Sequence, residues 1–152
     1  MKGKKVVEVA LKEVGYKETP TNSNKTKYGK WFGLDGVAWC GIFVSWVYNQ
    51  SGVSLGNIGF TKGYAGCQSA VAHFIKTKEV TKTPQIGDIV FFDWNLDGRY
   101  DHTGIFNGWI DDKTFSTIEG NTSLTNQSNG GEVMKRKRNN KGVIFVHPKV
   151  LN

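Results

Sequence analysis

The sequence changes character at Pro84, and this change limits the folds that the chain can adopt. Before it, apolar residues recur at helical spacing, which predicts helices over residues 2–14, 40–50 and 67–78. After it come short runs rich in Val, Ile, Phe and Thr, separated by turn signals, and these predict strands. The predicted strands cover residues 86–93, 102–109, 113–119, 132–137 and 143–147. Helices first and an antiparallel meander second indicate an α+β domain.

One domain with a single core fits a chain of 152 residues. At this length folding buries roughly 70% of the surface that the unfolded chain exposes, so the core needs no disulfide or metal. Two cysteines are too few for a disulfide scaffold. We therefore expect residues 1–152 to form one domain. The stretch from Glu18 to Lys30 is rich in Thr, Asn and Lys, and we expect no regular element there.

The charge balance favours a polyanionic partner. The chain has 20 basic and 13 acidic residues, a net charge of +7, which suits nucleic acid, an anionic membrane or an anionic cell-wall polymer. The amino end starts with lysines, but Glu8, Lys12 and Glu13 interrupt its apolar residues, so we predict no signal peptide. No apolar run approaches the roughly 20 residues that span a bilayer, which predicts no membrane insertion.

The run Lys135-Arg136-Lys137-Arg138 is the part of the chain that most resembles a nucleic-acid patch. Alternation along a strand places the two lysines on one face and the two arginines on the other. That pattern is more typical of a solvated edge strand that resists aggregation. No zinc knuckle, RNP motif or helix-turn-helix pattern accompanies the run, so we predict no nucleic-acid binding.

Cys40 stands at the predicted start of a mostly apolar helix. A thiol there meets the positive end of the helix dipole and free N–H groups, which lower its pKa and can support an oxyanion. A lone cysteine is more often a small core residue. Cys67 opens the next predicted helix in the same way, and a Cys40–Cys67 disulfide is a further alternative. Position alone leaves these interpretations open.

His102 and Glu119 favour the catalytic interpretation of Cys40. His102 begins a predicted strand, a rigid place for a general base, and Glu119 and Asn121 stand at the end of the next one. If residues 102–109 and 113–119 pair as a hairpin, His102 and Glu119 lie at the same end. A carboxylate or amide there can accept the imidazole N–H and stabilise the imidazolium.

Several sequence blocks, in order, resemble one family. WCGIFVSWV around Cys40, IGDIVFFDW before DHTGI at His102, and IEGN at Glu119 closely resemble the CHAP domain. CHAP domains are cysteine, histidine-dependent amidohydrolases/peptidases within the papain-like and NlpC/P60 group of peptidoglycan hydrolases. The resemblance implies N-terminal helices packed on an antiparallel sheet. It also implies that Cys40 is the nucleophile, His102 the general base and Glu119 the group that orients it, with Asn121 completing the site.

Aromatic residues are the candidates for substrate binding. Tyr28, in KYGKWFG, resembles a tyrosine that NlpC/P60 relatives place near the oxyanion. Aromatic faces can pack on sugars and peptide stems, and ordinary core burial is the alternative for each one. The candidate groove walls are Trp31, Trp39, Tyr64 and Trp94.

No metal site is predicted, although calcium was considered. Some relatives bind calcium in the loop before the cysteine, but here that loop offers only Asp35. Asp93, Asn95 and Asp97 imitate the opening of an EF-hand loop, yet Gly104 stands where the bidentate Glu belongs. A hairpin turn is the favoured interpretation, so no cofactor is required.

The resemblance implies a monomeric catalytic domain of a phage endolysin or another bacterial lytic enzyme. With no signal peptide predicted, it would be made in the host cytoplasm and reach the wall after holin-type release or lysis. The net positive charge suits an anionic wall carrying teichoic acids, which indicates Gram-positive peptidoglycan as the target. The bond would be the sugar–peptide amide or a stem or cross-bridge peptide bond. Two alternatives are a wall-binding module of the same fold without turnover and a basic nucleic-acid-binding domain.

Overall fold

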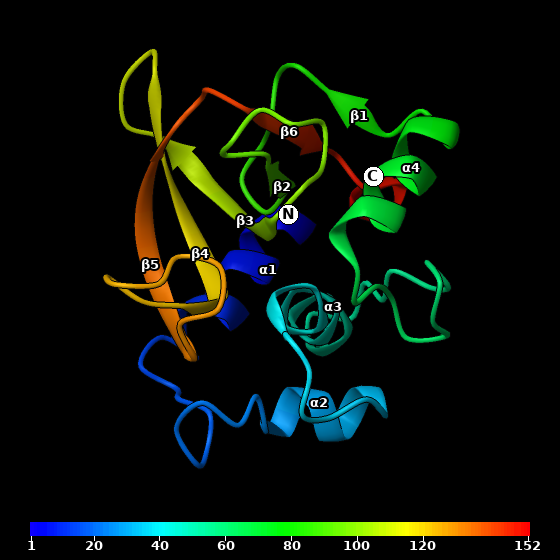
Figure 1. The fold of residues 1–152 in the computed structure, drawn as a ribbon. Coiled ribbons are helices and arrows are strands. Elements are labelled where there is room, and N and C mark those ends of the chain that lie inside the picture. The colour runs from blue at the N-terminus through cyan, green and yellow to red at the C-terminus, as the bar shows by residue number, and fades with distance from the viewer.

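The computed structural model describes residues 1–152 and contains four α-helices and one six-stranded antiparallel sheet (Figure 1). The helices are α1 (Lys2–Leu11), α2 (Lys27–Phe32), α3 (Cys40–Gln50) and α4 (Cys67–Lys76). The strands are β1 (Val80–Thr81), β2 (Ile89–Phe92), β3 (His102–Trp109), β4 (Thr114–Thr122), β5 (Glu132–Asn139) and β6 (Val143–Val146), followed by a 3-10 turn at Lys149–Leu151. The predicted α+β class is confirmed.

The strand order in the sheet is β1-β6-β2-β3-β4-β5. Strands β2 to β5 follow one another as the predicted meander, but β6 returns across the sheet to lie between β1 and β2. The expectation of a simple meander is therefore wrong for β6. Its return has a packing reason, because Phe145 and Val143 join an apolar cluster with Val90, Phe92 and Phe106.

Both faces of the sheet are buried. One face packs against the helices through Ile89, Phe91, Ile105 and Ile118, which belong to the main core. The opposite face carries the smaller cluster, which also includes Phe115. β2 is buried at all four of its positions for this reason. The middle strands are thus held from both sides, which fixes the residues at their ends.

α3 occupies the centre of the main core, as predicted. Eight of its 11 residues are buried, and it packs on β3 and β4. It is the longest helix in the structure, and none of the helices is long and apolar enough to cross a membrane. α3 is apolar nearly all round, and all of its faces are accommodated because it is buried between the sheet and α2.

The prediction of no regular element from Glu18 to Lys30 is wrong, because α2 begins at Lys27. The Thr26 side chain accepts a hydrogen bond from the Gly29 N–H at 3.0 Å and caps the helix. Gly33, at φ +89°, ends it in the left-handed conformation. The predicted helix over 2–14 is also too long, since α1 ends at Leu11.

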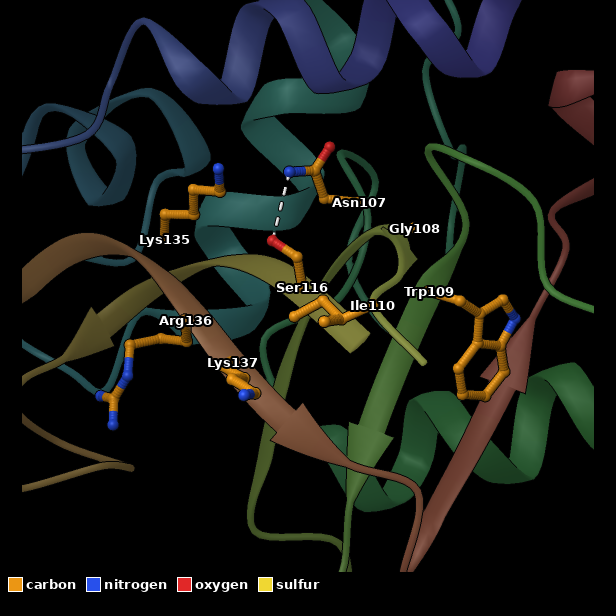
Figure 2. A pocket seen from close by; sticks show the side chains of 8 residues that line it. All are labelled: Asn107, Gly108, Trp109, Ile110, Ser116, Lys135, Arg136 and Lys137. Carbon is orange, nitrogen blue, oxygen red and sulfur yellow. Dashed lines mark hydrogen bonds between the residues drawn. The ribbon is translucent and has the colours of Figure 1, made fainter. Parts of the chain in front are cut away.

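β5 is an edge strand, as predicted, and its two faces differ in environment. Lys135 and Lys137 are exposed and, with Arg136, line the largest surface hollow, of about 410 Å³, whose other walls are Trp109 and further residues of β3, β4 and the turn between them (Figure 2). Arg138 projects from the other face and is buried. The expectation of a fully solvated strand is therefore wrong for this face of β5.

Candidate active site

Cys40 is the first residue of α3, and its thiol lies beside a second thiol. Trp39 caps the helix without a side-chain hydrogen bond, which leaves the first N–H groups of α3 free. The sulfur atoms of Cys40 and Cys67 are 4.0 Å apart, and both cysteines are free. The hydrogen bond from Cys67, the neighbouring His102 and the Gly41 N–H outweigh burial and hold the pKa of Cys40 well below its ordinary value. Cys40 is therefore a thiol that ionises readily.

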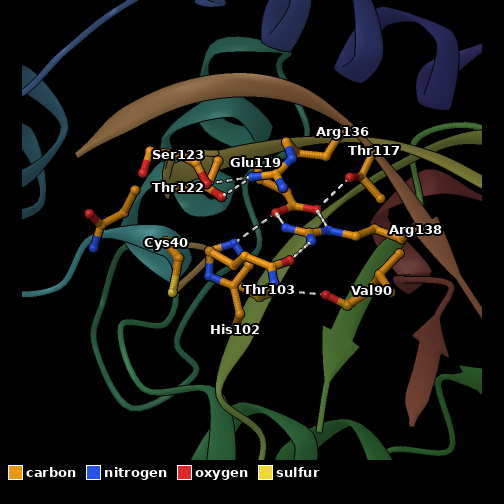
Figure 3. A network of polar contacts seen from close by, with 12 residues as sticks. Cys40, Val90, His102, Thr103, Thr117, Glu119, Thr122, Ser123, Arg136 and Arg138 are labelled. Atoms are coloured by element: carbon orange, nitrogen blue, oxygen red, sulfur yellow. Dashed lines mark hydrogen bonds and ion pairs between the residues drawn. The ribbon is translucent and has the colours of Figure 1, made fainter. Parts of the chain in front are cut away.

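His102 is fully buried at the start of β3, with its ring between Cys40 and Glu119 (Figure 3). Its Nε2 is 3.0 Å from Glu119 Oε1, while Nδ1 makes no hydrogen bond and faces the Cys40 side. Burial lowers the pKa of His102, but Cys40 and Glu119 outweigh it and raise the pKa to about 9. The imidazolium form is thus favoured at neutral pH.

The Glu119 carboxylate is buried at the centre of a charged network. Arg138 donates from Nε to Oε2 at 2.9 Å and from Nη2 to Oε1 at 2.6 Å. The Thr117 hydroxyl also donates to Oε2. Burial raises the pKa of Glu119, but Arg138 and His102 more than reverse this effect and lower it to about 2. Glu119 is therefore ionised and can hold His102 in a fixed orientation.

Aromatic rings enclose the charged groups. The Trp94 ring stacks on His102 with 5.5 Å between ring centroids, and Phe92 stacks on the same ring at 6.0 Å. The Arg138 guanidinium lies 4.8 Å from the centroid of Trp94. These rings exclude water from the Glu119–Arg138 pair, which strengthens its electrostatic interactions. Trp94 is only partly buried and lies next to His102, as a groove wall requires.

The sequence interpretation missed Arg138. It belongs to the basic run that was interpreted as a solvated edge strand, and it is far from Glu119 along the chain. Two signals could have found it. A buried carboxylate needs a cation, and alternation puts Arg136 and Arg138 on one face of β5, next to β4. Arg136 instead donates to Thr122 Oγ1 at 2.8 Å.

Asn121 lies outside the His102–Glu119 hydrogen-bond network. It is buried at φ +58°, donates through Nδ2 to Asn129 Oδ1 at 3.0 Å and accepts the Gly131 N–H at 3.0 Å. These bonds fasten the loop between β4 and β5. The structure thus brings Cys40, His102 and Glu119 together and gives the Asn121 side chain a different set of partners.

Three of the aromatic residues expected at the substrate are buried in the core. Tyr28 is fully buried and donates to Glu13 Oε1 at 2.7 Å. Trp39 is fully buried, stacks on Tyr28 and donates to Glu18 Oε1 at 3.1 Å. Tyr64 is fully buried as well. Because neither Trp39 nor Tyr64 reaches the surface, the expectation that they line a groove is wrong. Tyr28, expected near the oxyanion, packs against Trp39 in the core.

Trp31 and the approach to the thiol remain accessible. Trp31 is partly exposed on α2. Residues 35–38, before Cys40, and Asp101, before His102, are exposed as well. None of the four surface hollows contains Cys40 or His102.

In the turn that resembles the opening of an EF-hand loop, the carboxylates accept hydrogen bonds from the turn's own backbone. Asp93 accepts the backbone N–H groups of Asp97 and Gly98 at 3.2 and 2.8 Å. Asp97 accepts the Arg99 N–H at 2.9 Å. No group of three or more His, Cys, Asp or Glu side chains is arranged to hold a metal ion. The carboxylates of this turn thus accept hydrogen bonds from the turn's own backbone.

A helix-borne thiol, a strand-borne histidine and a buried carboxylate in this order define a papain-like site. Comparison with family models matches residues 32–121 to the CHAP domain. The chain therefore belongs to the CHAP family, whose members are papain-like domains acting in general as peptidoglycan amidases or peptidases. Comparison with curated protein sequences gave no match. The matched segment contains Cys40, His102 and Glu119, whereas Arg138 lies beyond it.

Proposed function

We propose that this chain is a cysteine amidohydrolase or peptidase that cleaves an amide bond of bacterial peptidoglycan. The observation that carries the proposal is the position of His102 between the Cys40 thiol and the Glu119 carboxylate. The family assignment supports the substrate class, and the geometry supports the proposed residue roles. Asn121, which the sequence resemblance added to this set, has the supporting role of holding the loop beside Glu119.

Acylation begins with the Cys40 thiolate. It attacks the carbonyl carbon of the scissile amide, and the oxyanion forms at the N–H groups that start α3. Each such donor contributes roughly 2.7–4 kcal/mol to catalysis in comparable sites. The His102 imidazolium then gives its proton to the amine, and the C–N bond breaks to leave a thioester on Cys40. Glu119 stabilises the imidazolium before this transfer.

Hydrolysis of the thioester restores the enzyme. Neutral His102 takes a proton from a water molecule, and the resulting hydroxide attacks the thioester carbonyl. The C–S bond breaks, the carboxylic acid leaves, and the Cys40 thiolate is again paired with the His102 imidazolium. Arg138 touches no reacting atom in this scheme, and its role is to keep Glu119 charged and in place.

We further propose that residues 1–152 are a monomeric catalytic domain of a phage endolysin or similar lytic enzyme. The net charge of +7 suits the anionic wall of Gram-positive bacteria. On this proposal the chain is made in the host cytoplasm and reaches the wall through holin-type release or lysis. No cofactor takes part in the scheme. The cleaved bond is the sugar–peptide amide or a bond in the stem or cross-bridge peptide.

The test is lysis of purified Gram-positive walls by the wild type and Cys40→Ala, following turbidity and new amino groups. The wild type should clear the walls and release amines, and Cys40→Ala should do neither while still binding. Mass spectrometry of the fragments then names the bond. Equal lysis by both proteins would make Cys40 structural. Wall binding without lysis by the wild type, on several wall types, would favour a binding module.

A further inference from the structure

We propose that Cys40 and Cys67 form a modification site at which hydrogen peroxide converts the two thiols into a disulfide. The disulfide blocks Cys40 reversibly, so its effect on activity rests on the proposed function, whereas its formation does not. Cys67 has no part in the catalytic scheme above. Its position next to Cys40 therefore calls for a separate explanation.

The positions of the two sulfur atoms carry this proposal. They lie 4.0 Å apart although the residues are 27 positions apart in the sequence. Cys40 is the first residue of α3 and Cys67 the first of α4, so two helix starts meet at this point. A disulfide bond is about 2.05 Å long, so the sulfurs need to approach by about 2 Å.

The surrounding structure keeps the two thiols close. Ser45 Oγ accepts the Tyr64 N–H at 3.0 Å and lies 2.9 Å from the Gly41 carbonyl oxygen. A Cβ at Gly41 would lie 2.8 Å from the Tyr64 ring, so only glycine allows this contact. These contacts fasten the segment before α4 to the first turn of α3. The proximity of Cys40 and Cys67 is thus fixed by neighbouring groups on both helices.

The Cys40 and Cys67 thiols differ in how readily they ionise, and disulfide formation by peroxide needs one of them to be a thiolate. The Cys67 hydrogen bond and His102 lower the pKa of Cys40, whereas the interaction with Cys40 and burial raise the pKa of Cys67. Cys40 is therefore the thiolate that peroxide meets first. Both cysteines are less than a tenth exposed.

The chemistry balances in two steps. The Cys40 thiolate attacks one oxygen of hydrogen peroxide, the O–O bond breaks, and a sulfenic acid and hydroxide form. Hydroxide takes the proton of the Cys67 thiol, and the Cys67 sulfur attacks the Cys40 sulfur. The S–S bond forms as the S–O bond breaks, and the sulfenic oxygen leaves as hydroxide, which takes the proton of the His102 imidazolium and becomes water. Two thiols have lost two electrons to one peroxide, and two water molecules have formed.

The experiment treats the wild type, Cys67→Ser and Cys40→Ser with hydrogen peroxide and follows intact mass and linked peptides. The wild type should lose about 2 Da and yield a Cys40–Cys67 peptide pair that dithiothreitol separates. Cys67→Ser should instead gain about 32 Da at Cys40, the mass of a sulfinic acid, which dithiothreitol does not remove. Cys40→Ser should consume peroxide much more slowly, because burial still raises the pKa of Cys67.

Activity gives the second measurement, with each variant normalised to its own untreated sample. Peroxide should inactivate the wild type at least tenfold, and dithiothreitol should restore it, whereas Cys67→Ser should stay inactive. Equal recovery of both proteins, or a wild type that gains oxygen without losing 2 Da, would overturn the proposal. A wild type that forms the disulfide but never lyses walls would disprove only the proposed function.

Discussion

Arg138 grips the carboxylate of Glu119 with two parallel hydrogen bonds, at 2.9 and 2.6 Å, beneath the ring of Trp94. His102 binds the same carboxylate from the other side. A cation contributed by an edge strand therefore determines the charge of the group that orients the histidine. Buried ion pairs of this kind lose much of their stability when one partner is removed, because the other remains charged and unpaired.

Removal of this cation should damage both stability and catalysis. Arg138→Met leaves Glu119 buried without its cation, and we expect a loss of about 3–5 kcal/mol in the free energy of unfolding. Arg138→Lys keeps the charge but not the two parallel bonds, and should recover part of the loss. Urea unfolding and wall lysis measure the two effects. If Arg138→Met unfolds at the wild-type urea concentration, the pair contributes nothing to stability.

Acid should remove the stabilisation that Glu119 provides. The pKa of Glu119 falls from 4.5 to about 2 on folding, so its contribution is complete above pH 4.5 and is lost as the pH falls through 2. The shift corresponds to about 3 kcal/mol. We expect the difference in unfolding free energy between the wild type and Glu119→Gln to narrow by about this amount between pH 4.5 and 2. A difference that stays constant over this range would show that the carboxylate is not held ionised.

The Cys40 thiol should react as a thiolate at neutral pH. With the pKa of Cys40 lowered and that of His102 raised to about 9, the charged pair persists over neutral pH and is lost as the pH rises through 9. Wall lysis should fall over the same upper range, because His102 can no longer protonate the amine.

Alkylation by iodoacetamide checks this charged pair directly. Cys40 should react fast at pH 7 in the wild type and slowly in His102→Gln, where its pKa returns toward the ordinary value. Peptide mapping separates this reaction from that of Cys67, whose pKa is raised and which should react slowly in both proteins. Equal rates at Cys40 in the two proteins would mean that His102 does not stabilise the thiolate.

Gly104 should be sensitive to a single added methyl group. A Cβ there would lie 2.6 Å from Glu119 Cγ, so Gly104→Ala forces the carboxylate to move. Overpacking of this kind costs about 1–3 kcal/mol. The cost should shrink in the Glu119→Ala background, where the crowded atom is gone, and a double-mutant cycle in urea measures the difference. If the destabilising effects of Gly104→Ala and Glu119→Ala simply add, the strain at Gly104 does not come from its contact with Glu119.

Sequence patterns predicted well the elements whose side chains are buried on one face or all round. The helix over 40–50 and the strand over 102–109 have the predicted boundaries, because their apolar residues decide their placement. His102 and Glu119 meet as the predicted hairpin implied, and Cys40 lies beside them at the start of α3. α2 was missed because its signals are a cap at Thr26 and a stop at Gly33 rather than a periodic pattern.

The remaining differences arise from contacts between distant segments. Trp39 was expected at the substrate because aromatic rings suit a groove, and Tyr28 because it resembles a tyrosine near the oxyanion. The two rings instead stack on each other in the core. Arg138 was predicted to be exposed, because a run of four cationic side chains on an edge strand usually faces solvent. In the register of β4 and β5, Arg138 pairs with Phe115, and only the side-chain contacts of the folded structure show that it reaches Glu119.

The two faces of β5 have a consequence for how this segment can vary. Lys135 and Lys137 line the open hollow and make no hydrogen bond to the charged network. Arg138 is hydrogen-bonded to Glu119, and Arg136, which also lines the hollow, donates to the Ser123 carbonyl oxygen after β4. A saturation library over these four codons should therefore show that substitutions are tolerated at every second position. Almost any polar residue should be accepted at the lysines, and little besides arginine at position 138.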